Sequence, residues 1–395
     1  VRQADELAEA YARAASEANA AFGSPAVYAE QFVGNARHVE VQILGDGSGA
    51  VSHLWERECS AQRRHQKLVE IAPSPGLDPA IRQAVCAAAI TLGEAVNYKG
   101  LGTIEFLVDA DTHNFYFMEA NARLQVEHTV TEEVTGVDLV QAQIRLADGA
   151  SLSDLGLLQA NVPAPRGYAI QLRVNMEIMD SAGNVKPAGG RLSRFEVPTG
   201  PGLRTDTYGY SGYTTNPNYD SLLAKLIVSS PSGDFASTAR RAARALGDFE
   251  IEGVVTNLDF LARLVRHNTF LEGVITTRFV DEHVAELVQA ETREGEQQGA
   301  LAGTSVDPRD PLAVLEHGKT GALGDVGGPT ILALVDEDLP PGTTAVRAPM
   351  QGTIVSFEVQ PGDEVYSGML VIVMEAMKME HEIRAAVSGV VERLG

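Results

Sequence analysis

Lys378 has the most distinctive chemical surroundings of any residue in the sequence. The segments 369–374 and 379–385 alternate between apolar and polar residues and are joined by a short polar break. This pattern predicts a β-hairpin with Lys378 at its tip. A lysine at a hairpin tip is exposed and open to covalent modification, and its two methionine neighbours are unbranched side chains that suit a surface gripped by another protein. The alternative is an ordinary solvated lysine.

A second group of candidate residues lies on two segments that flank the turn 109–114. Alternation places Glu119 and Asn121 on the same face of the second segment, and pairing around the turn brings Glu105 close to Glu119. Two neighbouring carboxylates repel each other, but a divalent cation reverses that effect, and carboxylates with an amide oxygen are typical Mg²⁺ ligands. The alternative is a pair of exposed glutamates on a hydrated sheet.

Arg123, Gln125 and Glu127 follow this hairpin and alternate onto one side of the chain. A guanidinium and an amide can hold a small planar oxyanion, and a carboxylate beside them can accept its proton. The upstream run 62–67, QRRHQK, is strongly basic in a chain whose net charge is −22. Against that background, a concentration of positive charge favours an anion site over a solvated charge run.

The elements that would position these residues follow from hydrophobic periodicity. The segment 38–44 alternates as a strand, so His38, Glu40 and Gln42 share one face. The Gly-rich segment 45–49 joins this strand to another strand, and we therefore interpret it as a turn rather than a phosphate-binding loop. The other expected elements are helices at 1–22, 78–92, 138–147, 237–246 and 257–266, and strands at 27–32, 51–56, 168–175, 191–197 and 203–206.

Composition narrows the class of protein. A chain of 395 residues with 44% hydrophobic and 21% charged residues is typical of a soluble globular protein with two or three domains. Its acidity argues against a nucleic-acid partner, and no apolar run approaches the ~20 residues of a membrane helix. Cys59 and Cys86 form no disulfide framework and no signal peptide is evident, so we expect a cytoplasmic protein.

Two stretches resemble parts of the biotin-dependent carboxylases. The runs APMQG at 348–352 and EAMKM at 375–379 resemble the biotin attachment region of their carrier domain. Residues 1 to about 283 resemble the biotin carboxylase subunit of these enzymes, an ATP-grasp ligase. The motifs that carry this second resemblance are RHVEVQ at 37–42, ECS at 58–60, QRRHQK at 62–67, MEANARLQVEH at 118–128 and NYDS at 218–221.

The resemblance implies an α+β architecture in four parts. Residues 1–150 would form an incomplete ATP-grasp domain, and 151–283 the C-terminal domain of a biotin carboxylase. A linker or small intervening element would occupy 284–343. Residues 344–395 would form an incomplete biotinyl/lipoyl-like carrier, an all-β flattened barrel.

The resemblance also implies a reaction and assigns residues to it. MgATP, or its Mn²⁺ counterpart, would phosphorylate bicarbonate to carboxyphosphate, whose CO₂ would carboxylate biotin held on Lys378. The implied metal ligands are Glu105, Glu119 and Asn121, and the implied ATP contacts are Glu30, Val33, His38, Gln62 and His65. The implied bicarbonate pocket is Arg123, Gln125 and Val126. The implied catalytic residues are Arg123, Glu127 as general base, Lys67 neutralising the anions and Arg204 holding the biotin enolate.

Some parts of the family pattern have no counterpart in this sequence. The Gly-rich loop and the lysines that cover the ATP phosphates are missing, and the second half of the carrier stops at Gly395. We therefore expect the sequence to be an excerpt of a longer chain that is inactive by itself. Bicarbonate-stimulated ADP release by the purified 395-residue chain would contradict this expectation.

The carboxyl acceptor depends on a carboxyltransferase that lies outside this sequence. Pyruvate-type enzymes place that domain between carboxylase and carrier, and the segment 284–343 is too short to hold it. We therefore expect acetyl-, propionyl- or a longer acyl-CoA as acceptor, with pyruvate or urea as alternatives. The expected partners are bicarbonate, the carboxyltransferase, a biotin protein ligase and further copies of the chain in a larger complex.

Two hypotheses from other classes remain open. One is a non-catalytic biotin carrier whose ATP-grasp part is only a scaffold. The other is an ATP-grasp ligase that activates a different carboxylate, with Lys378 unmodified or lipoylated.

Overall fold

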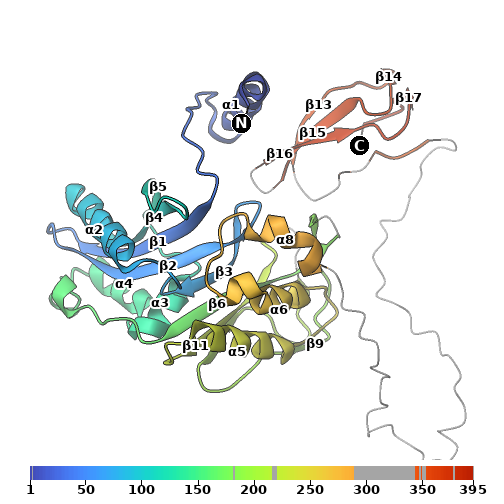
Figure 1. The fold of residues 1–395 in the computed structure, drawn as a ribbon. Helices are drawn as coiled ribbons and strands as arrows, with labels where there is room; N and C mark the ends of the chain where they lie inside the picture. The colour runs from blue at the N-terminus through green and yellow to red at the C-terminus, as the bar shows by residue number, and fades with distance from the viewer. Residues whose placement is uncertain are drawn as a thin grey trace, which may run out of the picture. The chain divides into compact units, whose positions relative to one another are not determined.

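One antiparallel sheet organises the chain up to residue 288. The computed structural model describes residues 1, 3–180, 183–215, 220–288, 343–346, 348, 353–376 and 379–394 (Figure 1). The sheet has eight strands in the order β10-β11-β6-β3-β2-β1-β4-β5. In chain order these are β1 Ala36–Asp46, β2 Val51–Arg63, β3 Gln66–Ala72, β4 Lys99–Asp109, β5 Phe115–Asn121, β6 Tyr168–Asn175, β10 Leu203–Thr207 and β11 Leu222–Ser230.

Helix α2, Pro79–Ala95, covers β1 and β2 on one face of the sheet. Its first turn is capped by Asp78, whose side chain accepts hydrogen bonds from the backbone N–H groups of Ala80 and Ile81. The apolar residues Val39 and Val41 pack against this helix in a buried cluster. The polar residues that alternate with them therefore face the other side of the sheet, as the sequence predicts.

Strands β3 and β6 divide their side chains between two helical layers. Val69 and Leu172 are paired across these strands and lie in one core with α5 (Phe235–Gly247) and α6 (Leu258–Arg266). The next residue along β3 and the preceding one along β6 are Glu70 and Gln171, which face the opposite layer. That layer contains α3 (His128–Thr135), whose Thr129 hydroxyl donates to Gln171.

The remaining elements are the N-terminal helix and several short helices and strands. Helix α1, Leu7–Phe22, ends at Gly23, whose φ of 70° suits glycine, and it confirms the predicted N-terminal helix. The other helices are η1 Ala4–Glu6, α4 Leu139–Ala147, η2 Gln159–Asn161, α7 Asn268–Leu271 and α8 Phe279–Val288. The short strand pairs are β7 Glu177–Met179 with β8 Val185–Pro187, and β9 Arg194–Glu196 with β12 Glu250–Glu252.

The C-terminal region is all β. Strand β15, Leu370–Ala376, pairs antiparallel with β16, Met379–Arg384, which confirms the predicted hairpin. Strand β13, Thr353–Phe357, adds to the other edge of β15, and β14, Glu364–Val365, pairs with β17, Gly389–Val390. Val371, Met374 and Ile383 are among the residues of a small core. Lys378, which the sequence analysis expects at the hairpin tip, lies outside the described residues.

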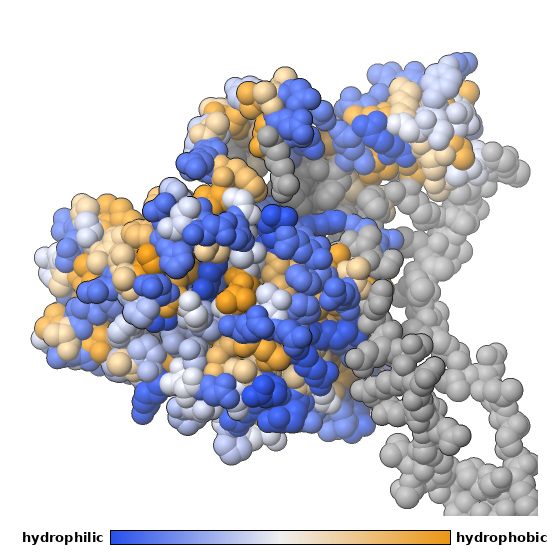
Figure 2. All heavy atoms as spheres, viewed as in Figure 1, coloured by the Kyte–Doolittle hydropathy of each residue, from blue (hydrophilic) through white to orange (hydrophobic). Residues whose placement is uncertain are grey.

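Two expectations are wrong. The segment 27–32 forms no strand, and Tyr28 and Phe32 are exposed. The linker does not begin at 284, because α8 continues to Val288, where Leu287 is buried in the core of α5 and α6. Figure 2 shows apolar side chains scattered among hydrophilic ones on the face in view, which is ordinary for a protein surface.

Candidate functional site

The pairing of four strands aligns a row of charged residues on the sheet face that α3 covers. Glu40 of β1 lies opposite Arg57 of β2 on one side and opposite Glu105 of β4 on the other. Glu105 in turn lies opposite Glu119 of β5. Residues directly opposite in an antiparallel pair point to the same face. The sequence prediction that Glu105 lies near Glu119 is therefore confirmed.

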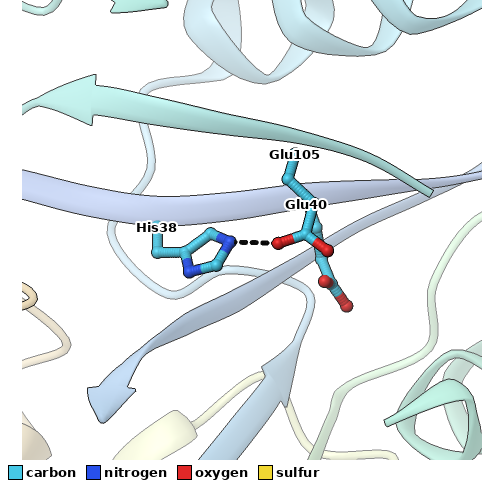
Figure 3. Close-up of side chains that lie close together, drawn as sticks. All are labelled: His38, Glu40 and Glu105. Atoms are coloured by element: carbon cyan, nitrogen blue, oxygen red, sulfur yellow. Dashed lines mark hydrogen bonds and ion pairs between the residues drawn. The ribbon is translucent and has the colours of Figure 1, made fainter. Parts of the chain in front are cut away.

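The carboxylate of Glu105 contacts four polar side chains of the site. Its Oε2 lies 2.6 Å from Nε2 of His38 and 3.4 Å from Nζ of Lys67. Its Oε1 accepts from the amides of Asn121 at 2.7 Å and Gln125 at 3.2 Å. Figure 3 shows the His38 ring directed at this carboxylate, with Glu40 beside it. Burial alone raises the pKa of Glu105, but the bond from His38 and the charge of Lys67 outweigh it and lower the pKa to about 2.

Lys67 is the cation between three buried carboxylates. Its Nζ lies 2.6 Å from Glu40 Oε2, 2.6 Å from Glu127 Oε1 and 3.4 Å from Glu105 Oε2. Burial disfavours its charge, yet the surrounding negative charges dominate and hold the pKa of Lys67 above its usual value. For Glu40, burial raises the pKa, but Arg57 and Lys67 together lower it to about 2. Glu40, Glu105 and Lys67 are therefore a compact set of ionised side chains.

Glu127 is held by a cation at each oxygen. Lys67 contacts Oε1, and Nη2 of Arg173 donates to Oε2 at 3.0 Å. Arg173 also donates through Nε to Glu70, which lies on the neighbouring strand. The sequence analysis gave Arg173 no role. A signal was available, since Arg173 alternates with apolar residues along a buried strand, but only the packing of α3 against β6 reveals that it meets Glu127.

Arg123, Gln125 and Glu127 differ in exposure. Arg123 is exposed, and its Nη1 donates to Gln125 Oε1 at 3.0 Å. Gln125 and Glu127 are buried. The intervening carbonyl of Val126 accepts from Nζ of Lys225 at 3.0 Å. The structure thus joins Arg123 to Gln125 directly, and it connects Gln125 to Glu127 through Glu105 and Lys67.

The predicted metal ligands fit a hard divalent cation. The Asn121 Nδ2 donates to Glu105 Oε1 at 2.7 Å and to Glu119 Oε1 at 2.8 Å, so the amide lies between the two carboxylates. The nitrogen and oxygen of such an amide are interchangeable by a half-turn. With its oxygen facing the same point, the set becomes two carboxylates and an amide oxygen, which suits Mg²⁺ or Mn²⁺.

Two other clusters in the described part of the chain have metal-ligand chemistry. They are His38–Glu40–Glu105 and Glu40–Cys59–Glu127, and both contain Glu40. The ammonium of Lys67 already lies within 2.6 Å of Glu40. A metal ion bound through Glu40 would be repelled by Lys67 or would have to displace it. Glu105, Glu119 and Asn121 are therefore the better ligand set.

The predicted ATP contacts are dispersed. His38 and Gln62 are buried on β1 and β2, whereas His65 is exposed in the turn between β2 and β3, with φ of 64°. Glu30 is exposed and Val33 half-buried in a segment without regular secondary structure. The structure therefore joins only His38 to the charged group around Glu105 by a described contact, and the roles of the other four residues stay predictions.

Arg204 belongs to a different charged group from Glu127. Its Nε donates to Asp206 at 2.8 Å, and its Nη1 donates to Glu132 at 2.8 Å. Its side chain is 38% exposed. The arginine that contacts Glu127 is Arg173. The role of Arg204 toward biotin stays a prediction.

Three protein-family profiles match the chain. Residues 1–155 match "Carbamoyl-phosphate synthase L chain, ATP binding domain", 171–282 match "Biotin carboxylase C-terminal domain", and 344–395 match "Biotin-requiring enzyme". The chain is 47% identical to pyruvate carboxylase 1 of Caenorhabditis elegans over 302 residues, which cover 76% of this chain and 25% of that protein. The chain thus spans about a quarter of the length of this relative.

Solved structures of carboxylases are also similar to this chain. A pyruvate carboxylase from Rhizobium etli is 45% identical with a TM-score of 0.70, over 75% of this chain and 26% of that one. A single-chain, multi-domain long-chain acyl-CoA carboxylase is 38% identical with a TM-score of 0.62, over 90% of this chain and 32% of that one.

These matches identify the main parts of the chain. The fold is an ATP-grasp type of biotin carboxylase region followed by an all-β biotin–lipoyl region. Its cofactors are biotin and ATP with Mg²⁺ or Mn²⁺. Among the described helices, none has the length and apolar character needed to cross a bilayer. The chain therefore carries biotin carboxylase domains together with a biotin–lipoyl domain, and it belongs to the biotin-dependent carboxylases.

Proposed function

We propose that this chain uses ATP and bicarbonate to carboxylate biotin attached to Lys378, for delivery of the carboxyl group to a carboxyltransferase. The observation that carries the proposal is the position of Glu127. It is a buried carboxylate with Lys67 on one oxygen and Arg173 on the other, and it comes two residues after the buried Gln125, to which the exposed Arg123 donates.

Glu127 has the surroundings of a general base for a small polarised acid. Its carboxylate can accept a proton from a small acid bound beside it, provided that the acid is polarised. Arg123 supplies that polarisation, because its guanidinium and the Gln125 amide can hold the oxygens of bicarbonate. When the proton moves to Glu127, its charge is lost and Lys67 is free to neutralise the attacking anion.

The metal ligands lie close enough to connect this base to the nucleotide. Glu105 bonds to Gln125 and Asn121 through the same oxygen, so the expected metal and bicarbonate positions share a side chain. Mg²⁺ or Mn²⁺ held there would supply positive charge to the ATP phosphates. Phosphoryl transfer needs such positioned cations and little covalent help from the protein. Arg204, Glu30, Val33, Gln62 and His65 keep the roles that the family resemblance implies.

The comparisons favour pyruvate as the carboxyl acceptor over the acyl-CoA that the sequence analysis expected. The curated relatives at 44–47% identity are pyruvate carboxylases. Acyl-CoA remains a second candidate, because the long-chain acyl-CoA carboxylase aligns with 90% of this chain. In the complete protein that contains this sequence, labelled bicarbonate should end in a product of pyruvate; label only in a product of acetyl- or propionyl-CoA would overturn that choice.

Several finer expectations stay proposals. They are the boundary between the two biotin carboxylase domains at 150/151, the start of the carrier at 344, a biotin protein ligase as partner, and assembly with further copies. A cytoplasmic location also stays a prediction, and some relatives are mitochondrial pyruvate carboxylases.

Biotin on Lys378 is tested directly by mass spectrometry. The peptide that contains Lys378, taken from the natural protein, should carry one biotinyl group, and a Lys378→Arg variant should carry none. The same protein should release ADP from ATP faster when bicarbonate is present. A lipoylated or unmodified Lys378 would contradict the carrier assignment, whereas biotinylation without any bicarbonate stimulation would favour a non-catalytic carrier.

A further inference from the structure

Trp55 interrupts the regular alternation of β2. Its φ of 65° lies in the left-handed region, which a bulky residue rarely adopts. Val41 pairs with Glu56, and Ile43 pairs with His53. The two residues Leu54 and Trp55 therefore stand opposite the single residue between Val41 and Ile43, which makes this a β-bulge.

The bulge changes which face the following residues occupy. Leu54 packs with Leu44 in the cluster that contains residues of α4, on the same face of the sheet as α3. Arg57, three residues later, bonds to Thr131 of α3 on that face. In an uninterrupted strand, residues two apart share a face, so Glu56 would follow Leu54. Instead Glu56 faces α2, where it accepts from Arg82 at 2.7 Å.

Arg57 begins a series of contacts between charged side chains that ends at Glu127. It is fully buried, donates to one oxygen of Glu40, and donates to Gln42 at 2.9 Å. The other oxygen of Glu40 contacts Lys67, which contacts Glu127. Because Arg57 neutralises part of the Glu40 charge, Lys67 is shared between Glu40 and Glu127 rather than drawn to Glu40 alone.

We infer that the left-handed bulge at Trp55 is a positioning device for the proposed carboxylation: it turns Arg57 toward Glu40 and so keeps Lys67 between Glu40 and Glu127. Trp55 touches no reacting group and acts through Arg57. The inference rests on the proposed function, and it adds a residue and a backbone conformation to it.

Contacts to the segment after α4 hold the bulge in place. The indole Nε1 of Trp55 donates to the carbonyl of Pro163 at 2.8 Å. The backbone N–H of Trp55 donates to Nδ1 of His53 at 3.1 Å, and the two rings meet edge to face at 5.3 Å between centroids. The backbone N–H of His53 donates to the Gln159 side chain at 2.7 Å. An unfavourable backbone conformation persists when its surroundings over-determine it in this way.

Substitutions at Trp55 distinguish the role of its backbone conformation from the role of its indole side chain. Glycine adopts the left-handed region freely, and valine is β-branched and opposes it. In the complete protein, Trp55→Gly should keep most of the bicarbonate-dependent ADP release. Trp55→Val should lose about a hundredfold, the usual effect of a misplaced catalytic geometry. Asn97→Val is the matched control, because Asn97 also has a positive φ, 46°, but lies in an exposed turn.

A double-mutant cycle tests the route through Arg57. Arg57→Met should reduce activity as Trp55→Val does, and the double variant should lose little more than either single variant, because both remove the same contact. Losses that multiply, or a Trp55→Val variant as active as Trp55→Gly, would overturn the inference. If Trp55→Val does not fold, the pair Trp55→Gly and Arg57→Met decides: the first must stay active and the second must not.

Failure of the proposed function gives a different result. Wild-type protein without any bicarbonate-dependent ADP release would remove the carboxylation itself. The structural part is then tested by a crystal structure of Trp55→Val, in which Arg57 should have turned away from Glu40. Arg57 still bonded to Glu40 would overturn the inference whatever the activity.

Discussion

Replacing Glu127 with Gln is expected to slow bicarbonate-dependent ADP release by about 10²–10⁴-fold in the complete protein, the usual contribution of a general base. The amide keeps the shape of the side chain but cannot take the proton. The amide also removes a negative charge that faces Lys67 and Arg173 at 2.6 and 3.0 Å. Binding of ATP should change little, because the predicted nucleotide contacts are other residues. Initial rates at saturating ATP, with bicarbonate varied, measure the effect.

The matched control for Glu127→Gln is Glu94→Gln, the same chemical change at an exposed position on α2. It should leave the rate unchanged. A Glu127→Gln variant with wild-type activity would refute the general-base role and favour the reading in which the ATP-grasp region is only a scaffold.

Replacing Lys67 with Met is expected to destabilise the site strongly. Its ammonium is the charge that Glu40, Glu105 and Glu127 share, and none of the three is more than 3% exposed. Removing one partner of a buried ion pair leaves uncompensated charge and costs about 3–5 kcal/mol. The free energy of local opening of β3, measured by native-state hydrogen exchange, should fall by about that amount. Activity should be lost as well.

Lys99→Met provides the control for this measurement. Lys99 begins β4 in the same sheet but is exposed. Surface substitutions of this kind usually change stability by about 0.5 kcal/mol or less. Equal protection of the β3 amides in the Lys67→Met and wild-type proteins would contradict the view that Lys67 holds the carboxylates together.

The relationships between site residues that are close along the chain could be predicted from the sequence. Strict alternation along 38–44 predicts that His38 and Glu40 share a face, and a short turn fixes Glu105 opposite Glu119. The spacing of Arg123, Gln125 and Glu127 is enough to predict that they lie on one side of the chain. Each of these relationships joins residues close together along the chain or connected by one turn.

The contacts between site residues that are distant along the chain could not be predicted from the sequence. Arg173 meets Glu70 because β6 pairs with β3, about a hundred residues earlier in the chain, and it meets Glu127 because α3 packs against β6. Alternation carries no information on either arrangement. Arg57 was missed for a different reason. The bulge at Trp55 reverses the alternation of β2, so a regular pattern predicts the wrong face for Arg57.

Transfer of labelled bicarbonate to biotin tests the central claim most directly. The complete, biotinylated protein is incubated with ¹⁴C-bicarbonate, ATP and Mg²⁺, and the peptide that contains Lys378 is isolated under alkaline conditions. Label should appear on that peptide only when ATP is present, and Glu127→Gln should abolish it. Fully biotinylated Lys378 that takes no label while the protein releases ADP would contradict the account.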